Sequence, residues 1–212
     1  MMASTLLNPS SDAGVMKKAV YYASQLVSAV FSPVVLPVFT FSAIMLRDTT
    51  LPADRKWLIW GICLLTTTAI ISAYVVYLKA SGAVGSLDLD LREERTKPFI
   101  VGLASNCAGF ALVYWLDAPP LATWLMFCFI TNTLLVQIIT HWWKVSIHAT
   151  GVGGAVASWA FLFGAAALPW LILVPIVGAS RVVLRKHTTA QVIVGSLIGL
   201  CLTAVQLRYL LR

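Results

Sequence analysis

Two short polar segments contain all three histidines of the chain, together with cations, hydroxyl groups and an amide. The first segment, residues 141–148, carries His141, Lys144, Ser146 and His148. The second, residues 180–191, carries Ser180, Arg181, Arg185, Lys186, His187 and Gln191. A third polar segment, residues 80–98, holds half of the acidic residues and three further cations: Asp88, Asp90, Glu93, Glu94, Arg92, Arg95 and Lys97.

Several cations beside two histidines suit an anion with several oxygens, and phosphate is the leading candidate. Arginine binds phosphate oxygens in bidentate pairs, and such charge-assisted bonds strengthen where the dielectric is low. One imidazole could attack phosphorus while the other protonates the leaving oxygen. His187 and Gln191 are four residues apart and so share one helix face, where the amide could orient the imidazole. The pattern therefore predicts a phosphate-binding site in which two histidines take part in the reaction.

The elements that position these residues are predicted to be membrane-spanning helices. The chain of 212 residues is 59% hydrophobic and 11% charged, with a mean hydropathy of +0.88, whereas soluble domains average about 25% charged residues. We expect an all-α, polytopic transmembrane helix bundle forming one domain over residues 1–212, with a polar N-terminal tail (1–18) that lacks the order of a signal peptide. The net charge of +7 is interpreted as contact with lipid headgroups, so we expect no nucleic-acid partner.

Seven apolar runs are candidates for the spans. They cover residues 19–46, 57–78, 99–116, 121–140, 152–168, 170–179 and 188–210. The first is interrupted by Pro33 and Pro37, which predicts a kinked or a broken, partly re-entrant span. With seven spans the three polar segments lie on the same face of the membrane. With six, in which the fifth and sixth runs form one bent element, the third segment lies on the opposite face. We favour seven because it unites the segments.

In these segments the chain resembles the type 2 phosphatidic acid phosphatase superfamily of membrane enzymes. That family carries the motifs K-x6-R-P, P-S-G-H and S-R-x5-H-x3-D. The third appears here as Ser180-Arg181-x5-His187-x3-Gln191, with Gln in place of the final Asp, and the second as Val145-Ser146-Ile147-His148. The first is the weakest, because Lys97-Pro98 stands for R-P and Asp90 occupies the position of the leading Lys. The motifs lie within residues 80–200.

The resemblance implies a metal-independent hydrolase that needs no cofactor and acts through a phosphohistidine. His187 would attack phosphorus, His148 would protonate the leaving group and then help to activate water, and Gln191 would orient His187. The phosphate oxygens would be held by a set of cations and one hydroxyl: Arg181, Ser146, Arg92, Arg95, Lys97 and Lys144. A neutral Gln191 cannot stabilise an imidazolium as Asp does, and a carboxylate of residues 88–94 could replace the missing charge.

Other interpretations of the same residues stay open. Cations at span ends ordinarily fix topology, and His141 beside Trp142 fits an aromatic belt. The alternative function is a non-catalytic lipid-phosphate binding or transport protein, which the neutral Gln191 favours. An ion or solute transporter is disfavoured because no ionisable residue lies deep in a span. Asn106, Asn132 and Gln137 are expected to make interhelical contacts. Neither the orientation of the site in the membrane nor the oligomeric state follows from the sequence.

Overall fold

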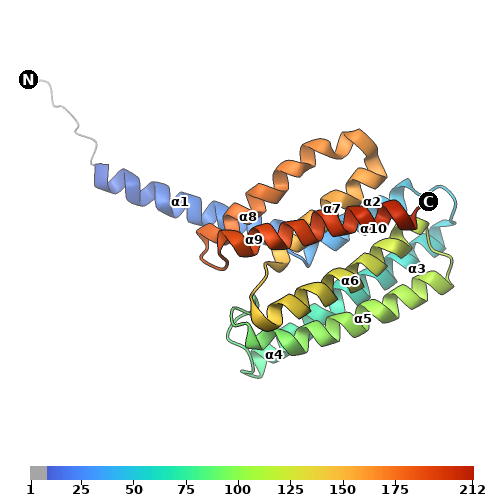
Figure 1. Cartoon of the computed structure of the whole chain (residues 1–212), viewed down its shortest axis with the longest axis horizontal. Helices are drawn as coiled ribbons and strands as arrows, with labels where there is room; N and C mark the ends of the chain where they lie inside the picture. Colours follow the sequence, from blue (N-terminus) through green and yellow to red (C-terminus); the bar gives the residue numbers. More distant parts are fainter. Residues whose placement is uncertain (1–8) are drawn as a thin grey trace, which may run out of the picture.

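The structure, a computed structural model, describes residues 9–212, and every regular element in that range is a helix (Figure 1). In chain order the elements are α1 (Pro9–Val30), α2 (Val35–Arg47), α3 (Ala53–Leu64), η1 (Leu65–Ala69), α4 (Ile70–Ala80), η2 (Glu93–Arg95), α5 (Thr96–Trp115), α6 (Pro120–Trp142), α7 (Ile147–Phe163), η3 (Gly164–Ile172), α8 (Leu173–Val183), α9 (Thr189–Leu197), η4 (Ile198–Leu202) and α10 (Thr203–Leu210). The prediction of an all-α chain is confirmed.

Five helical segments are long and apolar enough to cross a membrane. They are Ala53–Ala80, Glu93–Trp115, Pro120–Trp142, Ile147–Val183 and Thr189–Leu210. A sixth is obtained when Gly14–Val30 and Val35–Arg47, which are bent by 46° to each other, are taken as one broken span. The helices are therefore compatible with a multi-pass membrane protein. The expected seventh span is not reached by this criterion, because the fifth and sixth apolar runs belong to one segment, Ile147–Val183.

That segment nevertheless reverses direction. Its two ends meet, since the Lys144 ammonium donates a hydrogen bond of 3.0 Å to the Lys186 carbonyl and the Ser146 N–H donates one of 3.3 Å to the Gln191 carbonyl. The reversal lies in η3, which begins at Gly164 with a positive φ of 60° that a side chain would disfavour. In Figure 1, α7 leaves the left-hand end of the bundle and α8 returns to it. All three polar segments consequently lie at one end, as the seven-run arrangement predicts.

Part of the expected polar N-terminal tail is helical. Residues 9–18 belong to α1 (Pro9–Val30). Residues 1–8 of that tail lie outside the described residues. The bend between α1 and α2 spans the chain around Pro33, which confirms the expected interruption of this run.

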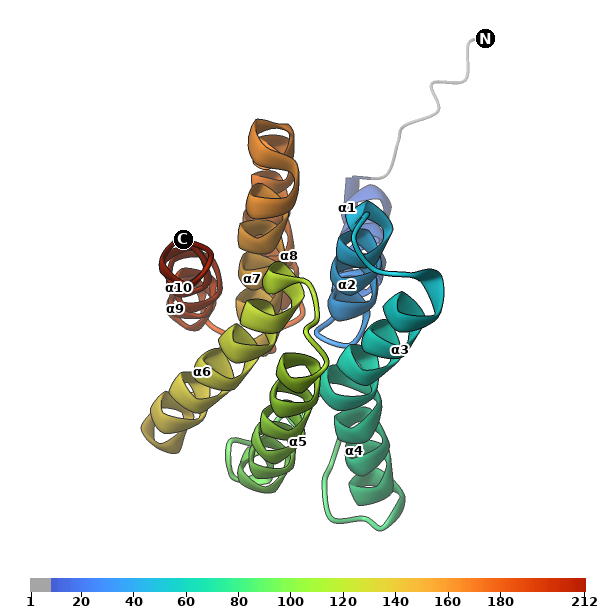
Figure 2. The same ribbon diagram turned by 90° about the vertical axis from the view of Figure 1, so that its right-hand side faces the viewer.

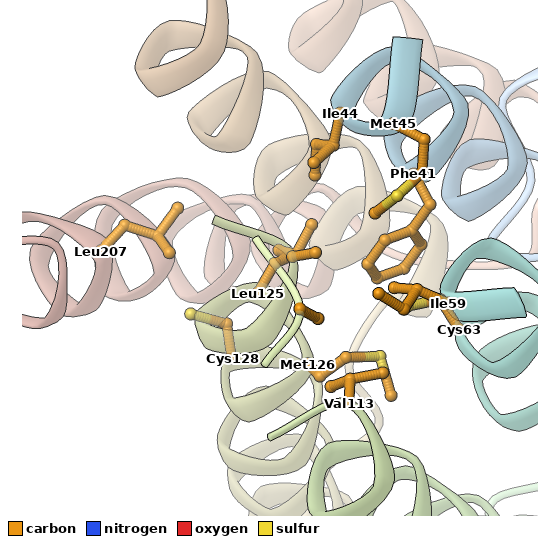
Figure 3. Packing of buried hydrophobic residues seen from close by; sticks show 12 residues of the cluster. Phe41, Ile44, Met45, Ile59, Cys63, Val113, Leu125, Met126, Cys128 and Leu207 are labelled. Carbon is orange, nitrogen blue, oxygen red and sulfur yellow. The ribbon is translucent and has the colours of Figure 1, made fainter. Parts of the chain in front are cut away.

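Two packing features hold the bundle together, one at the end opposite the polar segments and one nearer to them. At the opposite end, near the α5–α6 connection, a hydrophobic cluster packs α2, α3, α5, α6 and α10 (Figure 3). Nearer the polar end, α7 and the helix formed by α9 and η4 approach closely, because a Cβ at Gly199 would overlap the Thr150 carbonyl oxygen and one at Gly195 would lie 2.6 Å from the Ser146 carbonyl oxygen. This close packing sets the start of α7 beside the start of α9.

Candidate functional site

The three polar segments are joined by carboxylates of the connection between α4 and η2. Asp90 accepts a hydrogen bond of 2.7 Å from the Lys186 ammonium, and its backbone carbonyl accepts one of 2.8 Å from Lys144. Asp88 pairs with the Arg181 guanidinium at 3.0 Å and lies 3.8 Å from Lys186. These contacts join residues that are 54 to 98 positions apart in sequence into one cluster, which we call the charged cluster (Asp88, Asp90, Lys144, Arg181 and Lys186).

A cavity of about 480 Å³ begins beneath the charged cluster and continues between the helices. Its charged end is lined by Asp88, Arg95, His148, Arg181 and His187. Figure 2 shows the helices that contribute to its wall, α2, α4, α5, α6 and α7, arranged around a common centre. Both predicted histidines thus line one cavity, together with two arginines that are almost fully buried.

The orientation of His187 is fixed by its hydrogen bond to Gln191. The Nδ1 atom of His187 lies 3.1 Å from Oε1 of Gln191, and the same oxygen accepts the Thr188 N–H at 3.2 Å. Thr188 caps α9 and, with Gln191, forms a reciprocal capping box. Because an amide oxygen only accepts, we assign the proton of a neutral His187 to Nδ1, which leaves a lone pair on Nε2. The predicted role of Gln191 as the orienting group fits this geometry.

His187 is held in its neutral form. Burial lowers the pKa of its imidazole to about 3, and the positive charges of Arg95, Lys144 and Arg181 act in the same direction, while the hydrogen bond to Gln191 partly opposes them. A neutral imidazole at pH 7 can act as a nucleophile. A phosphate anion in the cavity would offset the repulsion from these cations.

Arg181 has the surroundings of an anion ligand. Its side chain is 4% exposed, Nη1 donates to the Ser28 hydroxyl at 2.5 Å, and Nη2 donates to Asp88. Its Nε, by contrast, is buried without a hydrogen-bond partner. An unpaired donor of a buried guanidinium is costly in free energy, so this atom is available to an oxygen of a ligand.

Of the three candidate ligands from the first motif, one lines the cavity and two do not. Arg95 lines the cavity, and its guanidinium is held by carbonyl oxygens of Leu89 and Val145, each at 2.9 Å. Arg92 instead points to Glu93 and to the Trp142 carbonyl, and Lys97 is exposed; neither lines the cavity. The cavity therefore gives no support to the predicted roles of Arg92 and Lys97 in phosphate binding, which stay predictions. The helical turn at η2 directs residue 95 inward and residues 92 and 97 outward.

Two further predicted phosphate ligands have structural roles. Ser146 is fully buried and caps α7, its hydroxyl accepting the Ala149 N–H, and it does not line the cavity. Lys144 donates to the backbone carbonyls of Asp90 and Lys186 and also lies outside the cavity wall. In this structure they position the site rather than contact a ligand within it, and Lys144 adds positive charge near His187.

Sequence reasoning did not single out Ser28, and it left the choice among the acids of residues 88–94 open. Ser28 is a small hydroxyl on α1, 153 residues before the arginine that it binds, and nothing in its neighbourhood marks it. Asp88 differs from Asp90, Glu93 and Glu94 in that it lines the cavity and pairs with Arg181. Burial raises the pKa of its carboxyl, but Arg181 outweighs this effect and the net pKa is lowered, so Asp88 is ionised.

Comparison with family models, curated proteins and solved structures found no match to this chain. Within residues 9–212, no three His, Cys, Asp or Glu side chains cluster as the ligands of a metal ion do.

The depressed pKa of His187 predicts that stability falls between neutral and mildly acidic pH. The unfolded chain binds a proton at this imidazole below about pH 6.5, whereas the folded chain does not bind it until about pH 3. The contribution is complete above pH 6.5 and is lost at up to about 1.4 kcal/mol per pH unit below it. Thermal unfolding in detergent between pH 7 and pH 4.5 should show a shallower slope for His187→Gln. An unchanged slope would contradict the buried, neutral imidazole.

The position of Asp88 predicts opposite effects of Asp88→Asn on anion binding and on stability. Removal of the negative charge beside the cavity should tighten binding of inorganic phosphate about tenfold. The buried Arg181 would lose its counter-charge, which should lower the free energy of unfolding by about 1–2 kcal/mol. Thermal unfolding with and without phosphate measures both. Asp90→Asn is the control, because Asp90 pairs with Lys186 but does not line the cavity; it should lower stability only. Weaker phosphate binding by Asp88→Asn would contradict this account.

Proposed function

We propose that this chain is a membrane-embedded lipid phosphatase with a site like that of the type 2 phosphatidic acid phosphatases, hydrolysing a phosphate monoester or pyrophosphate of a lipid without a metal ion. The observation that carries the proposal is that His148, His187, Arg95 and Arg181 line one cavity. Two imidazoles and two buried guanidinium groups are the parts that a phosphoryl transfer without metal requires.

In the proposed reaction Nε2 of His187 attacks phosphorus as the bond to the leaving oxygen breaks. His148 donates a proton to that oxygen, and it then accepts a proton from the water that hydrolyses the phosphohistidine. Arg181, through Nε, and Arg95 stabilise the negative charge on the phosphoryl oxygens. The N-termini of α7 and α9 lie beside these groups and favour the same anion.

The shape of the cavity supports a lipid substrate. Three residues of its wall are exposed: Val34 (43%) just before α2, Val76 (56%) on α4 and Leu87 (59%) on the connection that follows α4. The cavity therefore opens sideways between α2 and α4, within about 6 Å of the end of α4, given the rise of an α-helix. A substrate could place its phosphate at the histidines while its tail extends toward the bilayer.

A second function is favoured by Gln191 and Asp88. A neutral Gln191 does not stabilise the imidazolium that forms during transfer, and Asp88 occupies one edge of the Arg181 guanidinium. Both features suit a protein that binds lipid phosphates without turnover. The difference between the two functions is thus whether phosphate is released.

Release of inorganic phosphate from lipid phosphates in detergent, with EDTA present, tests the proposal. We expect turnover by the unaltered chain and a loss of at least about 10³-fold in His187→Ala, because the proposed nucleophile is removed. His141→Ala is the matched control: His141 is exposed, contacts Trp142 and does not line the cavity, so its loss should leave the rate within about twofold. Binding of the lipid without release of phosphate would favour the second function.

Gln191→Glu should raise kcat by about tenfold or more. Glutamate has the same length as glutamine, so the contact to Nδ1 and the capping box can persist, while the added charge stabilises the imidazolium and increases the basicity of His187. Gln191→Leu should lower kcat, because Nδ1 loses its partner. At unchanged thermal stability, a lower kcat for Gln191→Glu would contradict the effect of charge, and an unchanged kcat for Gln191→Leu would contradict the orienting role that we assign to residue 191.

A further inference from the structure

The cavity extends far below the histidines. On α7 its wall runs from His148 to Ser158, ten residues and about 15 Å of helix rise. On α6 it reaches Leu125 and Cys128, which belong to the hydrophobic cluster that closes the far end of the bundle (Figure 3). A phosphate occupies only the charged end, so the lower part of the cavity has the dimensions for part of a lipid tail.

The lower wall carries two buried amide oxygens without hydrogen-bond partners. Asn106 on α5 is 5% exposed, and its Oδ1 is unpaired. Asn132 on α6 donates through Nδ2 to the Thr203 hydroxyl at 2.9 Å, which confirms the expected interhelical contact and directs its unpaired Oδ1 elsewhere. Both residues line the cavity. We call them the deep amides.

Two hydroxyl groups of the same wall donate to carbonyl oxygens of their own helices. Thr67 donates to the Cys63 carbonyl at 2.6 Å, and Ser158 donates to the Gly154 carbonyl at 2.7 Å. Below the charged end, the described cavity wall contains three buried unpaired side-chain atoms: the Ser72 hydroxyl oxygen and the two Oδ1 atoms of the deep amides. The deep amides thus present acceptors, and what they lack is a donor.

A purely hydrocarbon tail would fill this space and leave both amide oxygens without a hydrogen-bond donor. An unsatisfied buried acceptor is unfavourable in free energy, whereas a hydroxyl or an amide N–H would satisfy it. We propose that the lower cavity is a binding subsite for a lipid phosphate whose tail carries a hydrogen-bond donor, a hydroxyl or an amide N–H. This inference rests on the proposed function for the position of the phosphate.

The depth of the donor follows from α7. A Cβ at Gly154 would lie 4.0 Å from Nδ2 of Asn132 and 3.5 Å from the Thr203 hydroxyl, so Asn132 lies level with residue 154. Residue 154 is six residues beyond His148, which places the subsite about 9 Å below the histidines. The donor should therefore be in the middle of the chain and not beside the headgroup.

Two single-chain lipids test the preference: hexadecyl phosphate and the same molecule with a hydroxyl on about the seventh carbon, a position that matches the depth given by the helix rise. Binding is measured by calorimetry in detergent with His187→Ala, so that no turnover interferes. We expect the hydroxylated lipid to bind about tenfold more tightly than hexadecyl phosphate. This ratio corresponds to the free-energy cost typical of one unsatisfied buried acceptor. Equal affinities would overturn the proposal, because they would mean that water satisfies the deep amides.

Leucine substitutions locate the preference. Asn106→Leu and Asn132→Leu, singly and together in the His187→Ala background, should reduce it to within about twofold, chiefly by tightening the binding of hexadecyl phosphate. Gln137→Leu is the matched control, since Gln137 on α6 also has a buried unpaired amide oxygen but does not line the cavity. A preference that survives loss of both deep amides, or that Gln137→Leu abolishes, would overturn the proposal.

Failure of the proposed function would give a different pattern. If the unaltered chain releases no phosphate from any lipid but the preference and its loss in the leucine variants hold, the subsite stands and hydrolysis does not. If the unaltered chain releases phosphate from both lipids, and the His187→Ala variant binds both lipids with equal affinity, hydrolysis stands and the subsite is overturned.

Discussion

The polar end of the bundle depends on two neighbouring carboxylates. Asp88 and Asp90 lie on a connection without regular structure, yet between them they contact Arg181, Lys186 and Lys144, which come from the other two polar segments. Without these contacts, the cations of residues 141–148 and 180–191 would lie close together without the acids that offset their repulsion. Because removal of one partner from a buried ion pair leaves an uncompensated charge, the cluster is specific as well as stabilising.

The same arrangement sets the electrostatic environment of the proposed site. The cations around the neutral imidazole of His187 outnumber the acids. Arg95 and Arg181 are buried away from bulk water, and in this environment of lower dielectric their interaction with an anion is stronger than in water. The close packing of Gly195 and Gly199 on α7 brings the N-terminus of that helix, with His148, alongside His187. Helix packing and ion pairs therefore both shape the proposed site, and the neutral Gln191 is the residue on which the two proposed functions differ.

The sequence predicted the helical class, the run with the proline break and the gathering of the three polar segments, because hydropathy and motif spacing are local signals. It did not give the ligand register of the first motif, since the choice between Arg92, Arg95 and Lys97 depends on one turn of helix. Ser146 and Lys144 matched a pattern but serve as a cap and a tether, which only the neighbouring backbone reveals. Ser28, on α1, has no local signal at all.

Trapping of the phosphorylated enzyme tests the central claim most directly. A lipid phosphate labelled in its phosphoryl group is mixed with the protein, the reaction is stopped within milliseconds by alkali, and the labelled peptide is sequenced. The account predicts an acid-labile, alkali-stable phosphoryl group on His187 that disappears as inorganic phosphate is released. Release of phosphate with no label on the protein, or with the label on another residue, would contradict it.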